Sequence, residues 1–159
     1  MASLPITKLP NTSLRKKAAE VKKITDLERK LLSDMAQTMY LNGGVGLAAT
    51  QVGIDKQLAV IDVGNGLVKM INPSVVKKEG FEYQEEGCLS VPNVSVKVKR
   101  AKKITVDYLT EDGQVQRVTA TGLFARALQH ELDHLSGKLI VDHLNPIKKF
   151  FSKKNDVSC

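Results

Sequence analysis

The sequence predicts an α+β fold with a mostly antiparallel β-sheet. Three observations predict it: a helical pattern before residue 43, several short β-branched segments between residues 58 and 121, and a second helical pattern after residue 121. Helices segregated from strands along the chain favour α+β over a doubly wound parallel sheet. The 159 residues, 42% of them hydrophobic, suit one domain with an ordinary core. We place that domain at residues 1–159, with a short basic tail at about 146–159.

The first helix is predicted to begin after Thr25. Thr25 and Glu28 have the spacing of a capping box, in which each side chain bonds the other's backbone N–H. Apolar residues then recur every four positions and are expected to form one buried face: Leu27, Leu31, Met35 and Met39. The helix should end at 42–44 (Asn-Gly-Gly), because glycine adopts the left-handed conformation at little cost.

Short β-branched runs then indicate strands. They are LAVIDV (58–63), VKMINPSVV (68–76), VSVKV (94–98) and ITVDYLT (104–110). The sequence Glu-Asp-Gly at 111–113 predicts a hairpin turn between the last of these and QVQRVTAT (114–121). Between two of the strands, EEGCLSVP (85–92) is interpreted as a turn that presents Cys88.

The second helix is predicted to begin at 121–122 (Thr-Gly) and to end at 136–137 (Ser-Gly). Its apolar positions recur at helical spacing: Phe124, Leu128, Leu132 and Leu135. Because the antiparallel strands precede it directly, we expect the sheet to wrap around this helix.

Composition limits the possible partners and compartments. The net charge of +7 comes from short basic clusters, which indicate solvated surface or a weak attraction to the ribosome, nucleic acid or anionic membrane. The chain has few aromatic residues and no tryptophan, so a base-stacking platform for nucleic acid is not expected. Two cysteines are too few for a disulfide framework, and no apolar run approaches a membrane span. We therefore expect a cytoplasmic protein that binds neither membranes nor specific nucleic acid sequences.

The second helix carries the motif His-Glu-x-x-His. Residues i and i+4 lie above one another on a helix, with Cβ atoms about 6 Å apart, so His130 and His134 can direct two imidazole nitrogens at one ion. Glu131 lies beside them, where a carboxylate can move protons for a water that a metal activates. The motif thus predicts that this is a central metal-binding helix. A metal-free amphipathic helix remains the alternative that the motif alone allows.

A catalytic metal site with one open position needs a third protein ligand. The downstream candidates are His143, Asp142 and Asp156, but too little chain follows for the usual downstream ligand helix, and His143 is expected to be a surface or core residue. Upstream, Cys88 is the remaining candidate. A lone cysteine is more often a small buried hydrophobe, but here it would complete a set that lacks one ligand.

The glycine-rich segment GGVGLAATQVG (43–53) follows a helix and lacks the lysine of a phosphate loop, so we do not assign it to phosphate binding. Its glycines leave backbone that a substrate can approach. Gln51 follows them with an amide that can donate to a developing oxyanion.

Taken together, GVGLAATQ (44–51), EGCLS (86–90) and QHELDHLSG (129–137) resemble the three signature motifs of the peptide deformylases, in the same order and spacing. The resemblance extends from about Pro5 to Leu144. It implies metal-dependent hydrolysis of the N-formyl group from the formyl-methionine that begins a new polypeptide, with release of formate. Formyl-methionyl nascent peptides would be the partners.

The resemblance also implies roles for individual residues. Cys88, His130 and His134 would bind one divalent metal, Fe²⁺ in the native state, with Zn²⁺, Ni²⁺ or Co²⁺ able to occupy the site. Glu131 would act as general base and acid. The side chain of Gln51 and the backbone N–H of Leu89 would stabilise the oxyanion.

Five further residues are expected to bind substrate. The backbones of Val45, Gly46 and Gly87 would pair with the peptide as an added strand. Arg126 and Gln84 stand at positions that line the methionine side-chain pocket in relatives, where aliphatic residues are expected. Arg126 would either alter the preference of that pocket or extend its charged group into water.

Two further expectations concern Arg100 and the tail. Arg100 is expected to pair with Glu86 and so to orient the metal loop. A tail this short should weaken ribosome docking.

Three other interpretations compete with this one. A metallopeptidase would need a downstream ligand, and a noncatalytic ribosome-binding module would need a closed site with four ligands. Covalent catalysis by Cys88 would leave the two histidines without a role.

Overall fold

In the computed structural model, residues 3–8 and 11–143 are described. The predicted tail at 146–159 and Asp156 lie outside them. In chain order the elements are η1 (Thr12–Arg15), α1 (Asp26–Leu41), β1 (Gly46–Ala48), η2 (Ala49–Val52), β2 (Leu58–Ile61), β3 (Val68–Glu79), β4 (Glu82–Cys88), β5 (Val91–Arg100), β6 (Lys103–Leu109), β7 (Val115–Thr121), α2 (Gly122–Leu135) and η3 (Ile140–His143).

Every strand pair is antiparallel. Five strands form one sheet in the order β1-β2-β3-β6-β7, and β4 pairs with β5 in a second sheet. The predicted α+β class with a mostly antiparallel sheet is therefore confirmed.

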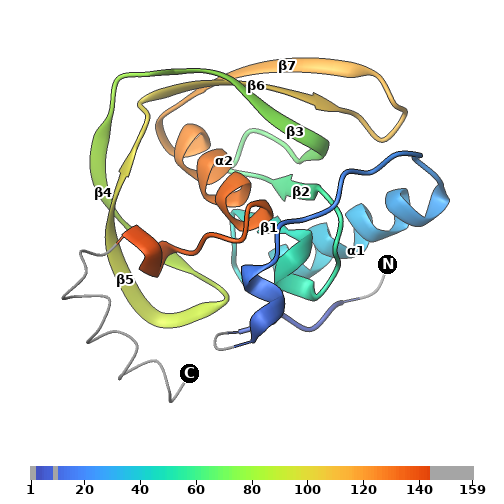
Figure 1. Cartoon of the computed structure of the whole chain (residues 1–159), viewed down its shortest axis with the longest axis horizontal. Helices are drawn as coiled ribbons and strands as arrows, with labels where there is room; N and C mark the ends of the chain where they lie inside the picture. Colours follow the sequence, from blue (N-terminus) through green and yellow to red (C-terminus); the bar gives the residue numbers. More distant parts are fainter. Residues whose placement is uncertain (1–2, 9–10, 144–159) are drawn as a thin grey trace.

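The two α-helices cover opposite faces of the five-stranded sheet (Figure 1). All four residues of β2 are buried, so both faces of this strand are covered. Leu58 and Val60 pack in the core around α1 with Met35 and Met39, whereas Ile61 packs in the core around α2. Successive side chains of a strand point to opposite faces, so a continuous apolar run fits a strand with a helix on each side.

A long bent hairpin carries the second sheet around α2. β3 continues through Gly80, at φ +64°, into β4, and β5 returns into β6 (Figure 1). Glycine adopts this left-handed conformation without the steric cost that other residues incur. The bend takes β4 and β5 out of the main sheet and brings the end of β4, with Cys88, beside α2.

The predicted turn at 85–92 is wrong in its extent. Residues up to Cys88 belong to β4, and only the two residues before Val91 form the turn. Glutamates usually disfavour strands, which is why the segment resembled a loop. Pairing with β5, whose Val96 and Val98 are buried, overrides that preference.

The first helix confirms the capping box and corrects the buried face. Thr25 accepts a hydrogen bond from the Leu27 N–H, and Glu28 reaches back to the Thr25 backbone. Met35 and Met39 are fully buried, but Leu27 is 55% exposed and Leu32 is buried instead. Steps of four residues advance about 40° around a helix of 3.6 residues per turn, so three steps carry Leu27 off the stripe that faces the core.

The second helix and its preceding hairpin are confirmed. Thr110 and Gln114 close the predicted turn, with Gly113 at φ +82°. α2 begins at Gly122, and its four predicted apolar residues all pack in the core: Phe124, Leu128, Leu132 and Leu135. Gly137 follows α2 at φ +79°.

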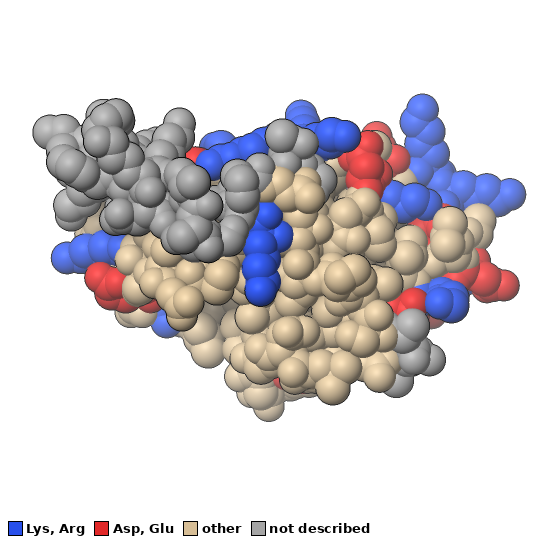
Figure 2. Space-filling view, turned by 90° about the horizontal axis from the view of Figure 1, so that it is seen from below, with Lys and Arg blue, Asp and Glu red and all other residues tan. Residues whose placement is uncertain are grey.

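Charge is distributed unevenly over the surface. On the face shown in Figure 2, uncharged side chains cover most of the middle, and lysine and arginine side chains lie mostly toward the edges. Within the described residues, neither α-helix combines the length and the apolar character needed to cross a bilayer.

Gly137→Ala should destabilise the protein more than Gly113→Ala. Both glycines have nearly the same positive φ, +79° and +82°, so both substitutions incur the left-handed strain, about 1 kcal/mol. A Cβ at 137 would also overlap the Arg15 carbonyl oxygen, whereas at 113 the nearest atom is a side-chain carbon of Ile24 at 3.9 Å. Overlap with backbone adds about 1–3 kcal/mol. Urea unfolding of the two variants measures the difference, and equal losses would contradict the close packing of Arg15 on Gly137.

Candidate metal centre and active-site pocket

Three predicted ligands converge at the centre of the molecule. Cys88 is the last residue of β4, and His130 and His134 lie one turn apart on α2. Their donor atoms all lie within 4.8 Å of one another, and they form the one such group of three among the described residues. The bend in the hairpin and the helical spacing thus bring together residues that are more than 40 positions apart in the sequence.

The distances fit one ion. The Nε2 atoms of His130 and His134 are 3.0 Å apart, and Cys88 Sγ is 3.2 Å from His134 Nε2. Donor atoms that share a tetrahedral metal are about 3.3–3.6 Å apart, so small outward shifts would suffice. Burial lowers the pKa of His134 well below its usual value. The imidazole is therefore neutral, as a metal ligand must be.

A buried ionic cluster orients His130. Glu86 Oε1 lies 3.1 Å from His130 Nδ1, and Arg100 donates to both carboxylate oxygens of Glu86 at 2.9 and 3.1 Å. Burial by itself raises the pKa of Glu86, but the hydrogen bonds from His130 and Arg100 lower it to about 2. The carboxylate thus fixes the ring so that Nε2 faces the other ligands. The predicted pairing of Arg100 with Glu86 is confirmed.

The same arginine connects the second sheet to α2. Arg100 also donates to Asp133 at 2.5 Å, and Asp133 lies directly before His134. Burial raises the pKa of Asp133, but its contacts with His143 and Arg100 lower it to about 2. His143 contacts Asp133 at 3.1 Å, is exposed and is not part of the ligand group, which agrees with the prediction of a surface or core residue.

Glu131 is buried beside the ligands without being one of them. Its Oε1 lies 4.0 Å from His130 Nε2, and its Oε2 has no hydrogen-bond partner among the described residues. Burial raises its pKa to about 7. A carboxyl group of this pKa can both accept and donate a proton near neutral pH.

The pKa of His130 shifts in the opposite direction from that of His134. Burial alone lowers the pKa of His130, but its interactions with Cys88 and Glu86 raise it to about 10. A ring with this pKa must lose its proton before it can bind a metal ion.

The amide of Gln51 is held in one orientation. Its Oε1 accepts from the backbone N–H of Ala48 at 2.9 Å. Its Nε2 therefore faces Cys88 Sγ, at 3.6 Å, and Ser90 Oγ, at 3.2 Å. A buried donor fixed beside these residues is able to stabilise negative charge, and the role of Gln51 in catalysis stays a prediction.

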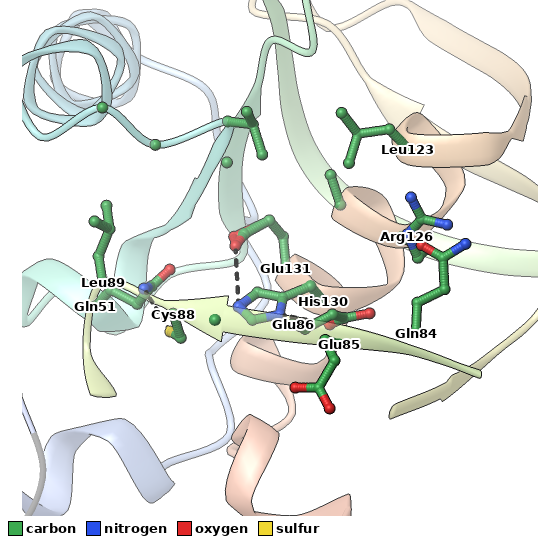
Figure 3. Close-up of a pocket in the computed structure, with 16 residues that line it drawn as sticks. Gln51, Gln84, Glu85, Glu86, Cys88, Leu89, Leu123, Arg126, His130 and Glu131 are labelled. Atoms are coloured by element: carbon green, nitrogen blue, oxygen red, sulfur yellow. Dashed lines mark hydrogen bonds and ion pairs between the residues drawn. The ribbon is translucent and has the colours of Figure 1, made fainter. Parts of the chain in front are cut away.

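The centre opens into a pocket of about 450 Å³ (Figure 3). All five residues predicted to bind substrate line it: Val45, Gly46, Gln84, Gly87 and Arg126. Leu89 and Gln51 lie at one end of the pocket, with Gln84, Arg126 and Leu123 at the other and Glu131 between them. A ligand that reaches the metal centre can therefore place a side chain between β4 and α2.

The glycines of the β1 segment allow close packing. A Cβ at Gly46 would lie 3.0 Å from Glu131 Cγ, and a Cβ at Gly44 would lie 2.9 Å from Leu89 Cδ1. Glycine at these positions thus leaves room for the Glu131 and Leu89 side chains, in addition to any room that a substrate requires.

β1 is an edge strand, and its backbone is partly free. Asp62 donates its N–H to the Val45 carbonyl, so Val45 faces the neighbouring strand β2. Hydrogen-bonding groups alternate along an antiparallel strand, so the N–H and carbonyl of Gly46 point to the open edge. The Val45 carbonyl thus already accepts one hydrogen bond within the sheet, and the pairing of Val45 with substrate stays a prediction.

Sequence reasoning did not identify Ser90, Asp133, Glu82 and Leu123. Ser90 is buried and accepts from Gln51, while Glu82 binds Arg126 through an ion pair of 3.1 Å. A period of two along β4, in which Glu82, Gln84, Glu86 and Cys88 share a face, was the available signal. It was missed because residues 85–92, the second half of the alternation, were interpreted as a turn.

A thiol and two imidazoles beside a buried carboxyl group, in an open pocket, define the metal-dependent hydrolases as the class of protein. A sequence profile described as polypeptide deformylase matches residues 3–150. The peptide deformylase of Caldanaerobacter subterraneus subsp. tengcongensis is 52% identical over 142 residues, which cover 89% of each chain. That of Thermoanaerobacter pseudethanolicus is 50% identical with the same coverage.

Solved structures agree with the sequence comparisons. The peptide deformylase of Legionella pneumophila superposes with a TM-score of 0.93 at 41% identity, covering 99% of this chain and 95% of that one. The enzyme of Synechococcus elongatus in complex with actinonin gives 0.91 at 41% identity, with 99% and 87% covered. The chain therefore belongs to the peptide deformylase family, whose members hydrolyse the N-formyl group of new polypeptides.

Cys88→Ser should weaken metal binding by roughly 100-fold or more, because loss of a direct ligand exceeds the effect of losing an orienting residue. Cys159→Ser, which removes the other cysteine of the sequence, is the matched control and should bind as the wild type does. Competition with a chromophoric chelator measures both affinities. Equal affinity of Cys88→Ser and wild type would exclude Cys88 as a ligand.

Proposed function

We propose that this chain removes the formyl group from formyl-methionyl nascent peptides and releases formate. The observation that carries the proposal is the convergence of Cys88, His130 and His134 beside the buried Glu131. We also propose that residues 1–159 act as a single metallohydrolase domain.

The ion in this proposal is Fe²⁺ in the native state, and Zn²⁺, Ni²⁺ or Co²⁺ can replace it. One thiolate and two imidazoles suit such borderline ions better than Mg²⁺ or Ca²⁺, which prefer oxygen ligands. When bound, the ion would supply Lewis acidity and lower the pKa of a nearby water.

Glu131 would move the protons. Its carboxylate would accept a proton from the attacking water and then donate one to the departing amine nitrogen. Three features support this role: burial, the raised pKa of about 7, and a carboxylate oxygen that no described residue binds. The water adds to the formyl carbon, the carbon–nitrogen bond breaks, and formate and a free amine result.

Gln51 and the Leu89 N–H would stabilise the oxyanion that forms on the formyl group. Both residues line the pocket, and the Ala48 N–H aims the Gln51 amide. Such a donor is already oriented before the reaction, and loss of one typically costs about 3–4 kcal/mol of barrier.

The substrate would enter as a strand between β1 and β4. Gly46 offers backbone groups at the open edge of β1, and Gly87 lies across the pocket on β4. The first side chain would then extend between Leu123, Arg126 and Gln84, at the end of the pocket away from Gln51.

We further propose a cytoplasmic location and, at most, weak ribosome attachment. The cytoplasmic location follows from the proposed substrate, because formylated nascent peptides emerge there. The net charge of +7 supports a weak attraction to the ribosome. No role in binding membranes or specific nucleic acid sequences is proposed.

Glu131→Ala should retain the metal and lose nearly all turnover. General acid–base catalysis contributes about 10²–10⁴-fold, and Glu131 lies outside the ligand group. Anaerobic formate release from formyl-Met-Ala-Ser measures activity, and metal analysis of the same sample measures occupancy. If the inactive variant also lacks metal, Glu131 is structural and the proposed proton transfer fails.

A further inference from the structure

Two hydrogen-bond donors lie together at the end of the pocket that would receive the first side chain. Arg126 comes from α2 and Gln84 from β4, and both lie at the end of the pocket away from Gln51 (Figure 3). Both line the same pocket as the metal ligands. Glu82 holds one terminal nitrogen of Arg126 at 3.1 Å, which fixes the guanidinium in place.

Most of these donors have no acceptor among the residues that the structure describes. Arg126 has five N–H groups, and its one acceptor in the described part of the chain is Glu82. No described residue accepts from the Gln84 amide. Gln84 is exposed, so a side chain that fills the pocket would take its amide out of water.

A methionine side chain cannot satisfy these donors. Its thioether sulfur is a weak acceptor, so binding would leave polar N–H groups covered and unpaired, which weakens the complex. Oxidation to the sulfoxide adds a strongly polar oxygen at the same atom and turns an apolar side chain into a polar one.

We propose that the pocket also takes peptides that begin with N-formyl-methionine sulfoxide, with Arg126 and Gln84 donating to the sulfoxide oxygen. This inference rests on the proposed deformylation. The reaction is the same hydrolysis: water cleaves the formyl carbon–nitrogen bond, formate leaves, and the sulfoxide is unchanged. No oxidant or reductant takes part.

Carboxylates that line the pocket favour a first side chain whose acceptor group is neutral. Glu85 and Glu86 line the pocket, and Glu82 already neutralises part of the Arg126 charge. An anionic first side chain would approach Glu85 and would find the Arg126 charge already partly neutralised by Glu82. A neutral group with a strong acceptor oxygen, as in a sulfoxide, satisfies the donors without that repulsion.

The experiment compares three peptides that differ at one side chain: formyl-Met-Ala-Ser, its sulfoxide, and the norleucine analogue, which lacks an acceptor. Formate release under anaerobic conditions gives kcat/KM for each. In the metal-loaded wild type we expect the sulfoxide to be hydrolysed at least as efficiently as the norleucine peptide.

Two variants test the donors, and one serves as control. Arg126→Leu should lower the sulfoxide-to-norleucine ratio of kcat/KM about 10-fold or more, as expected for loss of a charged donor, and Gln84→Leu should lower it several-fold. Gln51→Leu acts at the formyl group, so it should slow all three peptides alike and leave the ratio unchanged. Turnover of the norleucine peptide reports whether the Arg126 and Gln84 variants are folded, and circular dichroism reports it for Gln51→Leu.

The possible failures are distinguishable. If the wild type hydrolyses formyl-Met-Ala-Ser but rejects the sulfoxide 100-fold, or if neither Arg126→Leu nor Gln84→Leu changes the ratio, the inference is wrong and deformylation stands. If no peptide releases formate from the metal-loaded enzyme, the proposed function itself fails. Should Arg126→Leu not fold, the exposed Gln84→Leu variant still decides the outcome.

Discussion

The buried Arg100 guanidinium is the contact on which the metal centre depends. It comes from β5 and binds Glu86 on β4 and Asp133 on α2, so one side chain joins the second sheet to the helix. Only 4% of the Arg100 side chain is exposed. Removing one partner of such a buried pair typically costs about 3–5 kcal/mol, because the other charge is left without compensation. The ligands of the metal stand directly beside both carboxylates, so the cluster sets their relative positions.

The strand β4 concentrates four functions on one face. Its alternate residues Glu82, Gln84, Glu86 and Cys88 contact Arg126, line the pocket, orient His130 and supply the thiol. A period of two residues makes this arrangement possible in a strand, since alternate side chains point the same way. The bend at Gly80 is what turns this face toward α2, because it takes β4 out of the plane of the main sheet.

The sequence predicted the parts that depend on local pattern. The α+β class, both helices and the 111–113 turn follow from spacing, capping and turn chemistry, and the spacing of four residues pairs His130 with His134. Cys88 was only a remaining candidate on this reasoning, and its ligand role was implied by the resemblance of the motifs to those of the peptide deformylases. Leu27 was placed wrongly because a repeat of four drifts around the helix. The extent of β4 was missed because its glutamates are stabilised by partners on other elements, Arg100 and His130, which no local propensity describes. Ser90 and Asp133 gain their roles only through contacts made on folding.

The most direct measurement is X-ray absorption at the metal edge of the reconstituted enzyme. The account predicts one sulfur at about 2.3 Å, two imidazole nitrogens at about 2.0–2.1 Å, and an additional light atom from solvent. A spectrum without sulfur, or one that requires a fourth protein ligand, would contradict the open three-ligand centre formed by Cys88, His130 and His134.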